Sequence, residues 1–119
     1  MAKKQRSPCP VACTLDLLGD KWTLLVIRDL FLGKQRFEEL LASPERISTN
    51  ILSDRLKRLE ENGLIRKEPY GAHPGRMAYE LTELGRSLRP VLRAVIDWGL
   101  EHIPTTRLPE DLQRARTRR

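Results

Sequence analysis

The fold is decided by residues 47–81, which read ISTNILSDRLKRLEENGLIRKEPYGAHPGRMAYEL. The first part of this stretch predicts an amphipathic helix, because three leucines recur at helical spacing and form one apolar stripe. These leucines are Leu52, Leu56 and Leu59. Ser48 can cap the N-terminus of the helix, since its hydroxyl can accept a hydrogen bond from a free backbone N–H. Gly63 can end the helix, since glycine readily takes the left-handed conformation that follows many helices.

The second part of the stretch predicts a β-hairpin. Residues 64–68 and 77–81 have the pattern of short strands, and residues 69–75 between them are rich in proline and glycine. A further short helix is predicted at residues 37–41, at the distance that a helix-turn-helix requires. A helix followed by a basic β-ribbon is typical of a winged helix-turn-helix, in which the helix enters the major groove of DNA and the ribbon contacts the neighbouring backbone or minor groove. The predicted fold is therefore mainly α with a small β-wing, of the α+β class.

Several short motifs follow one another along residues 9–99. They are Cys9-Pro10-Val11, Leu18-Gly19-Asp20-Lys21-Trp22-Thr23, Arg28-Asp29-Leu30, Arg36-Phe37-Glu38-Glu39-Leu40, Leu52-Ser53-Asp54-Arg55-Leu56, Glu60-Glu61-Asn62-Gly63-Leu64-Ile65, Tyr79-Glu80-Leu81-Thr82 and Trp98-Gly99. In this order and spacing the chain resembles the HxlR family of bacterial winged helix-turn-helix transcriptional regulators, within the MarR-like superfamily. It departs from the family's pattern at Gly75, where a second proline is common, so a looser wing tip is expected.

The resemblance implies a regulator that binds double-stranded DNA sequence-specifically. Family members are dimers that pack through their terminal helices, so the resemblance also implies a homodimer with N- and C-terminal dimerisation helices. Two-fold symmetry in the protein predicts a pseudo-palindromic operator. Some relatives sense electrophiles or oxidants through a cysteine at the position that matches Cys9.

Two sets of side chains are candidates for DNA contacts. Candidates for contacts in the groove are Ser48, Thr49, Asn50, Ser53, Asp54 and Lys57. Candidates for phosphate or minor-groove contacts are Arg55, Arg58, Lys67 and Arg76. The simpler alternative is a solvated polar helix face beside a surface hairpin. The charge modestly favours DNA binding, because residues 46–76 hold seven basic and four acidic side chains, whereas residues 7–103 as a whole hold 14 of each.

The 119 residues predict one domain with two basic ends and a formal net charge of +6. We expect residues 1–8 to be a disordered basic arm, residues 9–103 to be the DNA-binding and dimerisation domain, and residues 104–119 to be a basic tail, either a frayed amphipathic turn or disordered. No apolar run reaches the roughly 18 residues that a membrane span needs, and no apolar segment of signal-peptide length follows the basic start. The protein is therefore expected in the cytoplasm, associated with the nucleoid.

Three further helices are predicted outside the central stretch. Residues 11–18 form the first, Asp20 caps the second over residues 21–32, and Thr82 caps a long third one that Pro90 should kink. The apolar arc of the third helix is broader than one small domain covers, which favours a dimer interface. The expected interface residues are Leu88, Leu92, Val95, Ile96 and Trp98. The alternative is that this arc packs on the chain's own core.

No catalytic constellation stands out, so neither enzyme activity nor a cofactor is expected. Cys9 precedes a helix and follows a basic arm, both of which stabilise a thiolate, and Cys13 lies one helical turn later. We consider both redox-sensing candidates, against the alternative that they are small apolar fillers. Two other functions stay open. One is a metal-responsive regulator in which a partner subunit supplies the ligands that two thiols lack. The other is a protein-interaction module or thiol-dependent enzyme that does not bind DNA.

Overall fold

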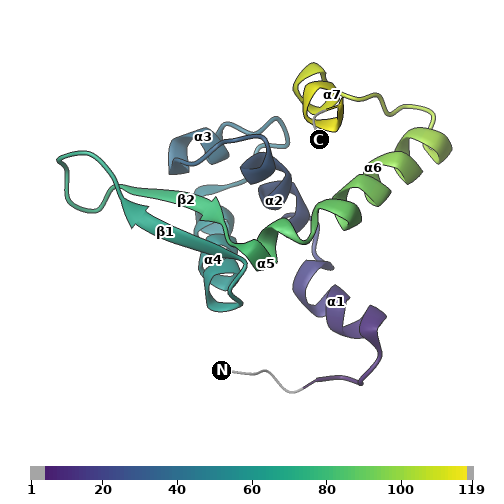
Figure 1. Ribbon diagram of the computed structural model, residues 1–119, viewed down its shortest axis with the longest axis horizontal. Helices are drawn as coiled ribbons and strands as arrows, with labels where there is room; N and C mark the ends of the chain where they lie inside the picture. The colour runs from purple at the N-terminus through teal and green to yellow at the C-terminus, as the bar shows by residue number, and fades with distance from the viewer. Residues whose placement is uncertain (1–4, 118–119) are drawn as a thin grey trace.

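The computed structural model describes the backbone of residues 5–117 and the side chains of residues 5–113. The described elements are, in chain order, α1 (Pro10–Leu18), α2 (Thr23–Phe31), α3 (Phe37–Leu41), α4 (Thr49–Glu61), β1 (Ile65–Pro69), β2 (Met77–Leu81), α5 (Glu83–Arg86), α6 (Arg89–His102) and α7 (Glu110–Thr117). The β1–β2 wing extends from one side of the molecule, whereas α1 and α6 extend from the opposite side (Figure 1). The predicted winged helix-turn-helix is confirmed.

The core lies where α2, α3 and α4 meet the base of the wing. Its buried apolar residues are Val26, Ile27, Leu30, Leu40, Ile47, Leu52, Leu56, Leu59, Leu64, Ile65 and Leu81. The predicted leucine stripe of α4 is therefore confirmed, because all three of its members belong to this cluster. Trp22 is half-buried and packs against the same cluster.

The start of α2 is fixed by the carboxylate of Asp20. This group accepts hydrogen bonds from the backbone N–H of Trp22 at 3.0 Å and of Thr23 at 3.1 Å, which satisfies two donors that a helix N-terminus leaves free. The predicted capping role of Asp20 is confirmed, although regular helix begins at Thr23 rather than at residue 21.

The wing is an antiparallel pair with a register that runs from Ile65 opposite Leu81 to Pro69 opposite Met77. A short bridge adds to it, because Arg36 pairs with Ala78 and the N–H of Tyr79 donates to the carbonyl of Gln35 at 2.8 Å. The sequence pattern did not predict this bridge. It joins the segment before α3 to β2, so the wing is held to the helix-turn-helix by backbone hydrogen bonding.

The C-terminal helix differs from the prediction. Thr82 does act as a cap, accepting from the N–H of Gly85 at 3.1 Å, but the helix that it caps is the single turn α5. A new helix, α6, starts at Arg89, and Pro90 lies in its first turn. The predicted kink at Pro90 is therefore wrong, because proline in the first turn removes only an N–H that would have no helical partner. Gly85 is buried, and a Cβ there would collide with the Leu64 carbonyl oxygen, so α5 can pack this closely only with glycine.

The structure describes part of the predicted N-terminal arm and part of the predicted C-terminal tail. In the predicted arm, Arg6 forms an ion pair with Asp16 of α1 at 2.7 Å, while residues 1–4 lie outside the described part. In the predicted tail the backbone forms α7, and residues 118–119 lie outside the described part. None of the helices among the described residues is long and apolar enough to cross a membrane.

Candidate nucleic-acid interface

Helix α4 turns its leucines to the core and leaves its first turns in solvent. The hydroxyl of Ser48 accepts from the N–H of Ile51 at 3.2 Å, which confirms the predicted N-cap. All six predicted groove candidates are exposed: Ser48, Thr49, Asn50, Ser53, Asp54 and Lys57. The structure therefore brings the predicted groove candidates together on the solvent side of a helix that is rigidly docked to the core.

The turn before α4 is held by Arg28 of α2. The Arg28 guanidinium donates to both carboxylate oxygens of Glu45, at 2.9 and 2.8 Å, and to the hydroxyl of Ser43 at 3.1 Å. The hydrogen bond from Arg28 is the main reason that the pKa of Glu45 falls from 4.5 to about 2, with burial acting in the opposite direction. Arg28 also pairs with buried Asp29, whose pKa is raised by burial. This network ties the turn between α3 and α4 to α2, and sequence analysis did not predict it.

Arg55, a predicted phosphate or minor-groove contact, forms ion pairs within its own chain. Its Nε donates to Oδ2 of Asp20 at 2.8 Å. Its Nη1 forms an ion pair with the carboxylate of the preceding residue, Asp54. Burial opposes the charge on Asp20, yet hydrogen bonds from Thr23 and Arg55 hold the pKa of this carboxyl well below its usual range. The guanidinium is thus engaged inside the protein, on the side of α4 that faces α2.

The remaining basic candidates differ in whether they form ion pairs with carboxylates. Arg58 lies 3.8 Å from Asp54, and Lys67 lies 3.6 Å from Glu60. Within residues 5–113, neither Lys57 nor Arg76 forms an ion pair with a carboxylate. Arg76 is exposed at the tip of the wing. These two cations are therefore the ones most available to DNA.

Two further arginines were missed by sequence analysis. Arg46 is exposed one turn before α4 and has a positive φ of 63°, which is uncommon for a residue with a side chain. Arg36 is exposed beside the outer half of the wing, with its guanidinium 4.7 Å from the ring centre of Tyr70. The position of Arg46 two residues before the predicted cap at Ser48 was a usable signal. Arg36 carried none, because its place beside the wing depends on the unpredicted bridge to Ala78.

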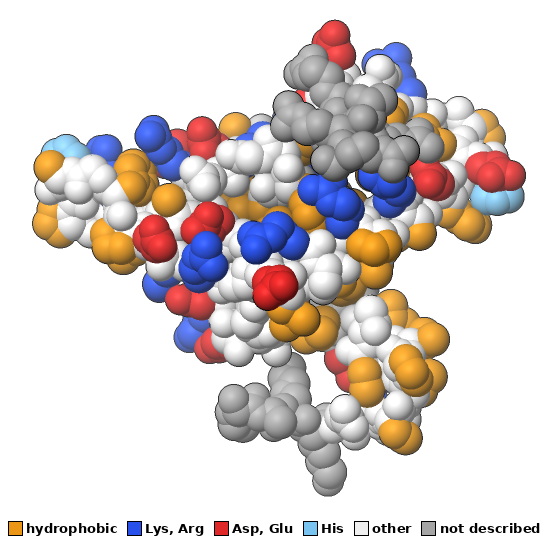
Figure 2. All heavy atoms as spheres, in the orientation of Figure 1, with side chains coloured by type: hydrophobic (Ala, Val, Ile, Leu, Met, Phe, Trp, Pro, Cys, Tyr) orange, Lys and Arg blue, Asp and Glu red, His pale blue; other side chains and the backbone are white. Residues whose placement is uncertain are grey.

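Apolar side chains are exposed on the two projecting helices. Figure 2 shows hydrophobic side chains gathered over α1. The exposed large apolar residues on α1, α5 and α6 include Val11, Leu15, Leu17, Leu84, Val91, Val95 and Trp98. Relative exposures of 52% for Val95 and 61% for Trp98 leave an apolar strip on α6 without cover from its own chain. This strip and the apolar side chains of α1 are suited to contact a second subunit.

The other predicted interface residues have partners within the chain. Leu88 packs against the core, whereas Leu92 and Ile96 are half-buried and line a cavity with Phe31 of α2 and Leu112 of α7. The prediction treated the two apolar stripes of the last helix as one interface. In the structure they have separate surroundings, because one faces α2 and α7 and the other faces solvent.

The two cysteines lie at the start of α1 and are both free thiols. Cys9 is exposed and occupies the N-cap position of α1. Cys13 is half-buried, and its thiol donates to the carbonyl of Ser7 at 3.3 Å.

Comparison with known proteins agrees with this geometry. The model of the HxlR-like helix-turn-helix family matches residues 17–107. The HTH-type transcriptional regulator YdeP of Bacillus subtilis (strain 168) is 41% identical over 91 residues, covering 76% of this chain and 71% of YdeP. The solved structure of PA1607 is 36% identical and superposes with a TM-score of 0.78, covering 88% of this chain and 74% of that one. The redox regulator HypR in its reduced form is 35% identical with a TM-score of 0.68, covering 78% of this chain and 92% of that one. The protein thus belongs to the HxlR family of helix-turn-helix transcriptional regulators, and it is not an enzyme.

Proposed function

We propose that the protein binds a pseudo-palindromic operator as a homodimer and acts at the bacterial nucleoid. The observation that carries this proposal is the exposed N-terminal half of α4, whose short polar side chains are free to meet base edges. Asn50 is the strongest candidate for direct readout, since an asparagine amide can pair with both N6 and N7 of adenine. Lys57 and Arg76 supply phosphate or minor-groove contacts.

The homodimer is proposed from the surfaces of α1 and α6. Val95 and Trp98 are the centre of the contact on α6, and Val11 and Leu15 contribute from α1. Two-fold pairing of these helices presents two copies of α4 to one face of the duplex. The expected spacing between half-sites is then about one helical turn, or 10–10.5 bp.

Operator selection from random duplex DNA, followed by footprinting and quantitative mobility shifts over a salt series, tests this proposal. We expect two inverted half-sites and a negative slope of log affinity against log salt. Arg76→Ala should weaken binding to all sequences and reduce the magnitude of that slope by about one. Arg107→Ala, which removes an exposed arginine from the segment between α6 and α7, is the matched control. Failure to select any sequence, with binding that ignores salt, would refute DNA binding.

We further propose that Cys9 makes the regulator responsive to oxidants. The exposed N-cap thiol supports this role, and so does the similarity to a redox regulator. A disulfide between two subunits would form with loss of two protons and two electrons to the oxidant. A bridge at α1 would alter the dimer contact and hence the spacing of the two copies of α4. Cys13 is the weaker candidate, because its thiol is half-buried and engaged with Ser7.

A metal-responsive regulator is the other possibility on this fold. Within the part of the chain that the structure describes, no group of three or more histidine, cysteine and acidic side chains is placed to hold a metal ion. A site at Cys9 and Cys13 would therefore need ligands from a second subunit. Stoichiometric metal in the purified dimer is the measurement that distinguishes this function.

A further inference from the structure

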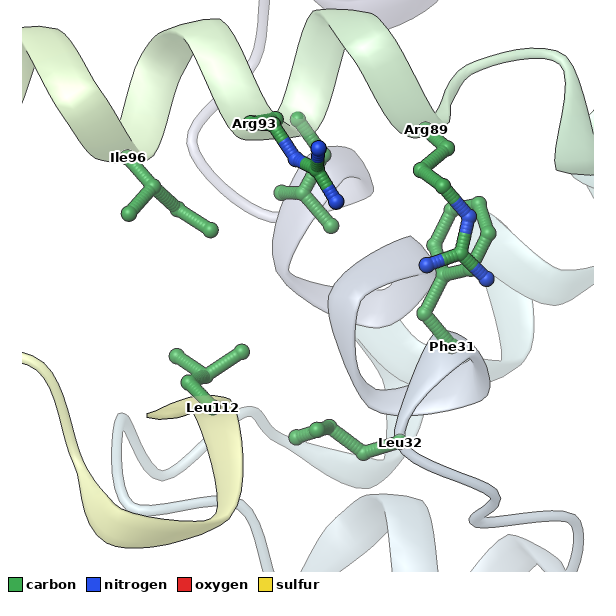
Figure 3. Close-up of a pocket in the computed structure, with 7 residues that line it drawn as sticks. Phe31, Leu32, Arg89, Arg93, Ile96 and Leu112 are labelled. Atoms are coloured by element: carbon green, nitrogen blue, oxygen red, sulfur yellow. The ribbon is translucent and has the colours of Figure 1, made fainter. Parts of the chain in front are cut away.

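We propose that the cavity between α2, α6 and α7 binds a small organic acid, meaning a molecule with one carboxylate on an apolar body. Phe31 and Leu32 at the end of α2 form one wall, and Leu112 of α7 closes the side opposite α6 (Figure 3). The remaining wall is one face of α6, made of Arg89, Leu92, Arg93 and Ile96. These positions recur at helical spacing, so the four side chains point the same way.

The chemistry of the lining selects an anion. The side chains of Arg89 and Arg93 lie one turn apart and extend from α6 toward α2 (Figure 3). Among the described residues that line the cavity none is acidic, and within residues 5–113 neither arginine forms an ion pair with a carboxylate. Like charges at this spacing repel each other, and a bound carboxylate would relieve that repulsion while accepting charge-assisted hydrogen bonds.

The rest of the lining selects an apolar body for the same ligand. Phe31, Leu32, Leu92, Ile96 and Leu112 offer no hydrogen-bonding side-chain group. The Arg89 guanidinium lies 5.0 Å from the ring centre of Phe31, so this exposed cation is held over an aromatic face at the edge of the cavity. An inorganic anion would meet the arginines but would leave the apolar walls unused.

The cavity is too small for an aromatic ligand unless a side chain of α7 moves. The cavity is partly open to solvent and its volume is about 40 Å³, whereas a cavity that accepts benzene is about 150 Å³. A ligand with one ring must therefore displace the side chain of Leu112. Among residues 110–113 of α7, Leu112 is the one that is half-buried, while its neighbours are exposed. Displacement of the Leu112 side chain would enlarge the cavity, so the first turn of α7 covers the proposed ligand.

Comparing phenylacetate with its neutral isostere phenylacetamide separates the contribution of the anion contact from that of the apolar walls. Binding is measured on the free protein by thermal unfolding and calorimetry, so the result does not depend on DNA binding. A ligand that binds only the native state raises the Tm. We expect phenylacetate to raise the Tm of the wild type, and to raise that of Leu112→Ala further because truncation enlarges the cavity. Phenylacetamide should have no effect at the same concentration.

Arg93→Met tests the anion contact, since it keeps the apolar stem and removes the charge. We expect it to weaken phenylacetate binding by about tenfold or more. Arg107→Met makes the same change at an exposed position outside the cavity and should bind like the wild type. Equal binding of the acid and the amide, or full binding by Arg93→Met, would overturn the anion site. No binding by either the wild type or Leu112→Ala would overturn the ligand site altogether.

Discussion

Arg55 of α4 and Asp20 before α2 form an ion pair, with Nε and Oδ2 2.8 Å apart and side-chain exposures of 18% and 24%. The same carboxylate accepts the N–H groups of Trp22 and Thr23, so the pair ties α4 to the first turn of α2. Helix α1 ends at Leu18, immediately before this turn. We infer that Arg55 positions the DNA-reading helix relative to the N-terminal helices and does not bind phosphate.

Asp20→Asn is expected to weaken operator binding by about tenfold, because α4 loses its charged anchor. The slope of log affinity against log salt should stay unchanged, since no phosphate contact is removed. Asp16→Asn makes the same charge change on α1 and should bind like the wild type. If Arg55 is instead a phosphate contact, Asp20→Asn frees its guanidinium, and affinity will be equal to or higher than that of the wild type.

Val95→Glu is expected to yield monomers, because it places a charge in the proposed subunit contact of α6. Sedimentation velocity at micromolar concentration measures the change, with Thr105→Glu beyond the end of α6 as the control. Leu92→Glu should behave differently and lower the Tm, because Leu92 faces Phe31 and Leu112 of its own chain. A wild type that sediments as a monomer at this concentration would refute the interface.

The stability of the helix-turn-helix should fall in acid. The pKa of Glu45 is lower in the folded protein than its ordinary value of 4.5, so its contribution to stability is complete above pH 4.5 and is lost as pH falls toward 2. Asp20 acts in the same direction, and Asp29, whose pKa is raised by burial, opposes it.

Glu45→Gln tests the assignment to Glu45. Relative to the wild type, this variant should have a lower Tm at pH 7 and a smaller further loss of Tm between pH 5 and pH 3. Glu101→Gln, on the exposed end of α6, is the control for removal of one carboxylate. A variant whose Tm follows the wild-type pH profile throughout would show that Arg28 and Glu45 do not hold the turn.

Diamide is expected to release the wild type from its operator and to leave Cys9→Ser bound, while Cys13→Ser should respond like the wild type. The reason is that Cys9 is exposed at a helix N-terminus, whereas Cys13 donates to the Ser7 carbonyl. Mobility shifts with and without diamide, followed by reduction, measure this response. If diamide also releases Cys9→Ser from the operator, Cys13 is the redox-sensitive residue instead. If diamide does not release the wild type, the protein is not under redox control.

Local signals were sufficient to predict the helix-turn-helix and the wing. The leucine spacing of α4 and the cap at Ser48 depend only on neighbouring residues, and the structure confirms both. The break between α5 and α6 was missed because Pro90 is compatible with either a kink or a first turn. The choice between them depends on how closely Gly85 approaches Leu64, which is a contact between segments distant in sequence.

The direction of long side chains could not be predicted from periodicity. A helical wheel gave Arg55 an angle beside the polar face, but a guanidinium on a long stem can reach Asp20, which lies 35 residues earlier. The same limit applied to Leu92 and Ile96, because the pattern showed that they are apolar but not that α7 and Phe31 cover them.

Asn50→Ala and Asn62→Ala, compared on the selected operator, test most directly whether α4 reads DNA sequence. Both remove an asparagine amide, but Asn50 is exposed on the first turn of α4, whereas Asn62 follows the last turn and donates to the Arg58 carbonyl at 2.8 Å. Asn50→Ala should lose about 1–3 kcal/mol of binding free energy on the operator and almost none on unrelated DNA, because it loses a contact to a base. Asn62→Ala should bind the operator like the wild type. Equal affinities of the wild type and Asn50→Ala for the operator would contradict sequence readout by this face of α4.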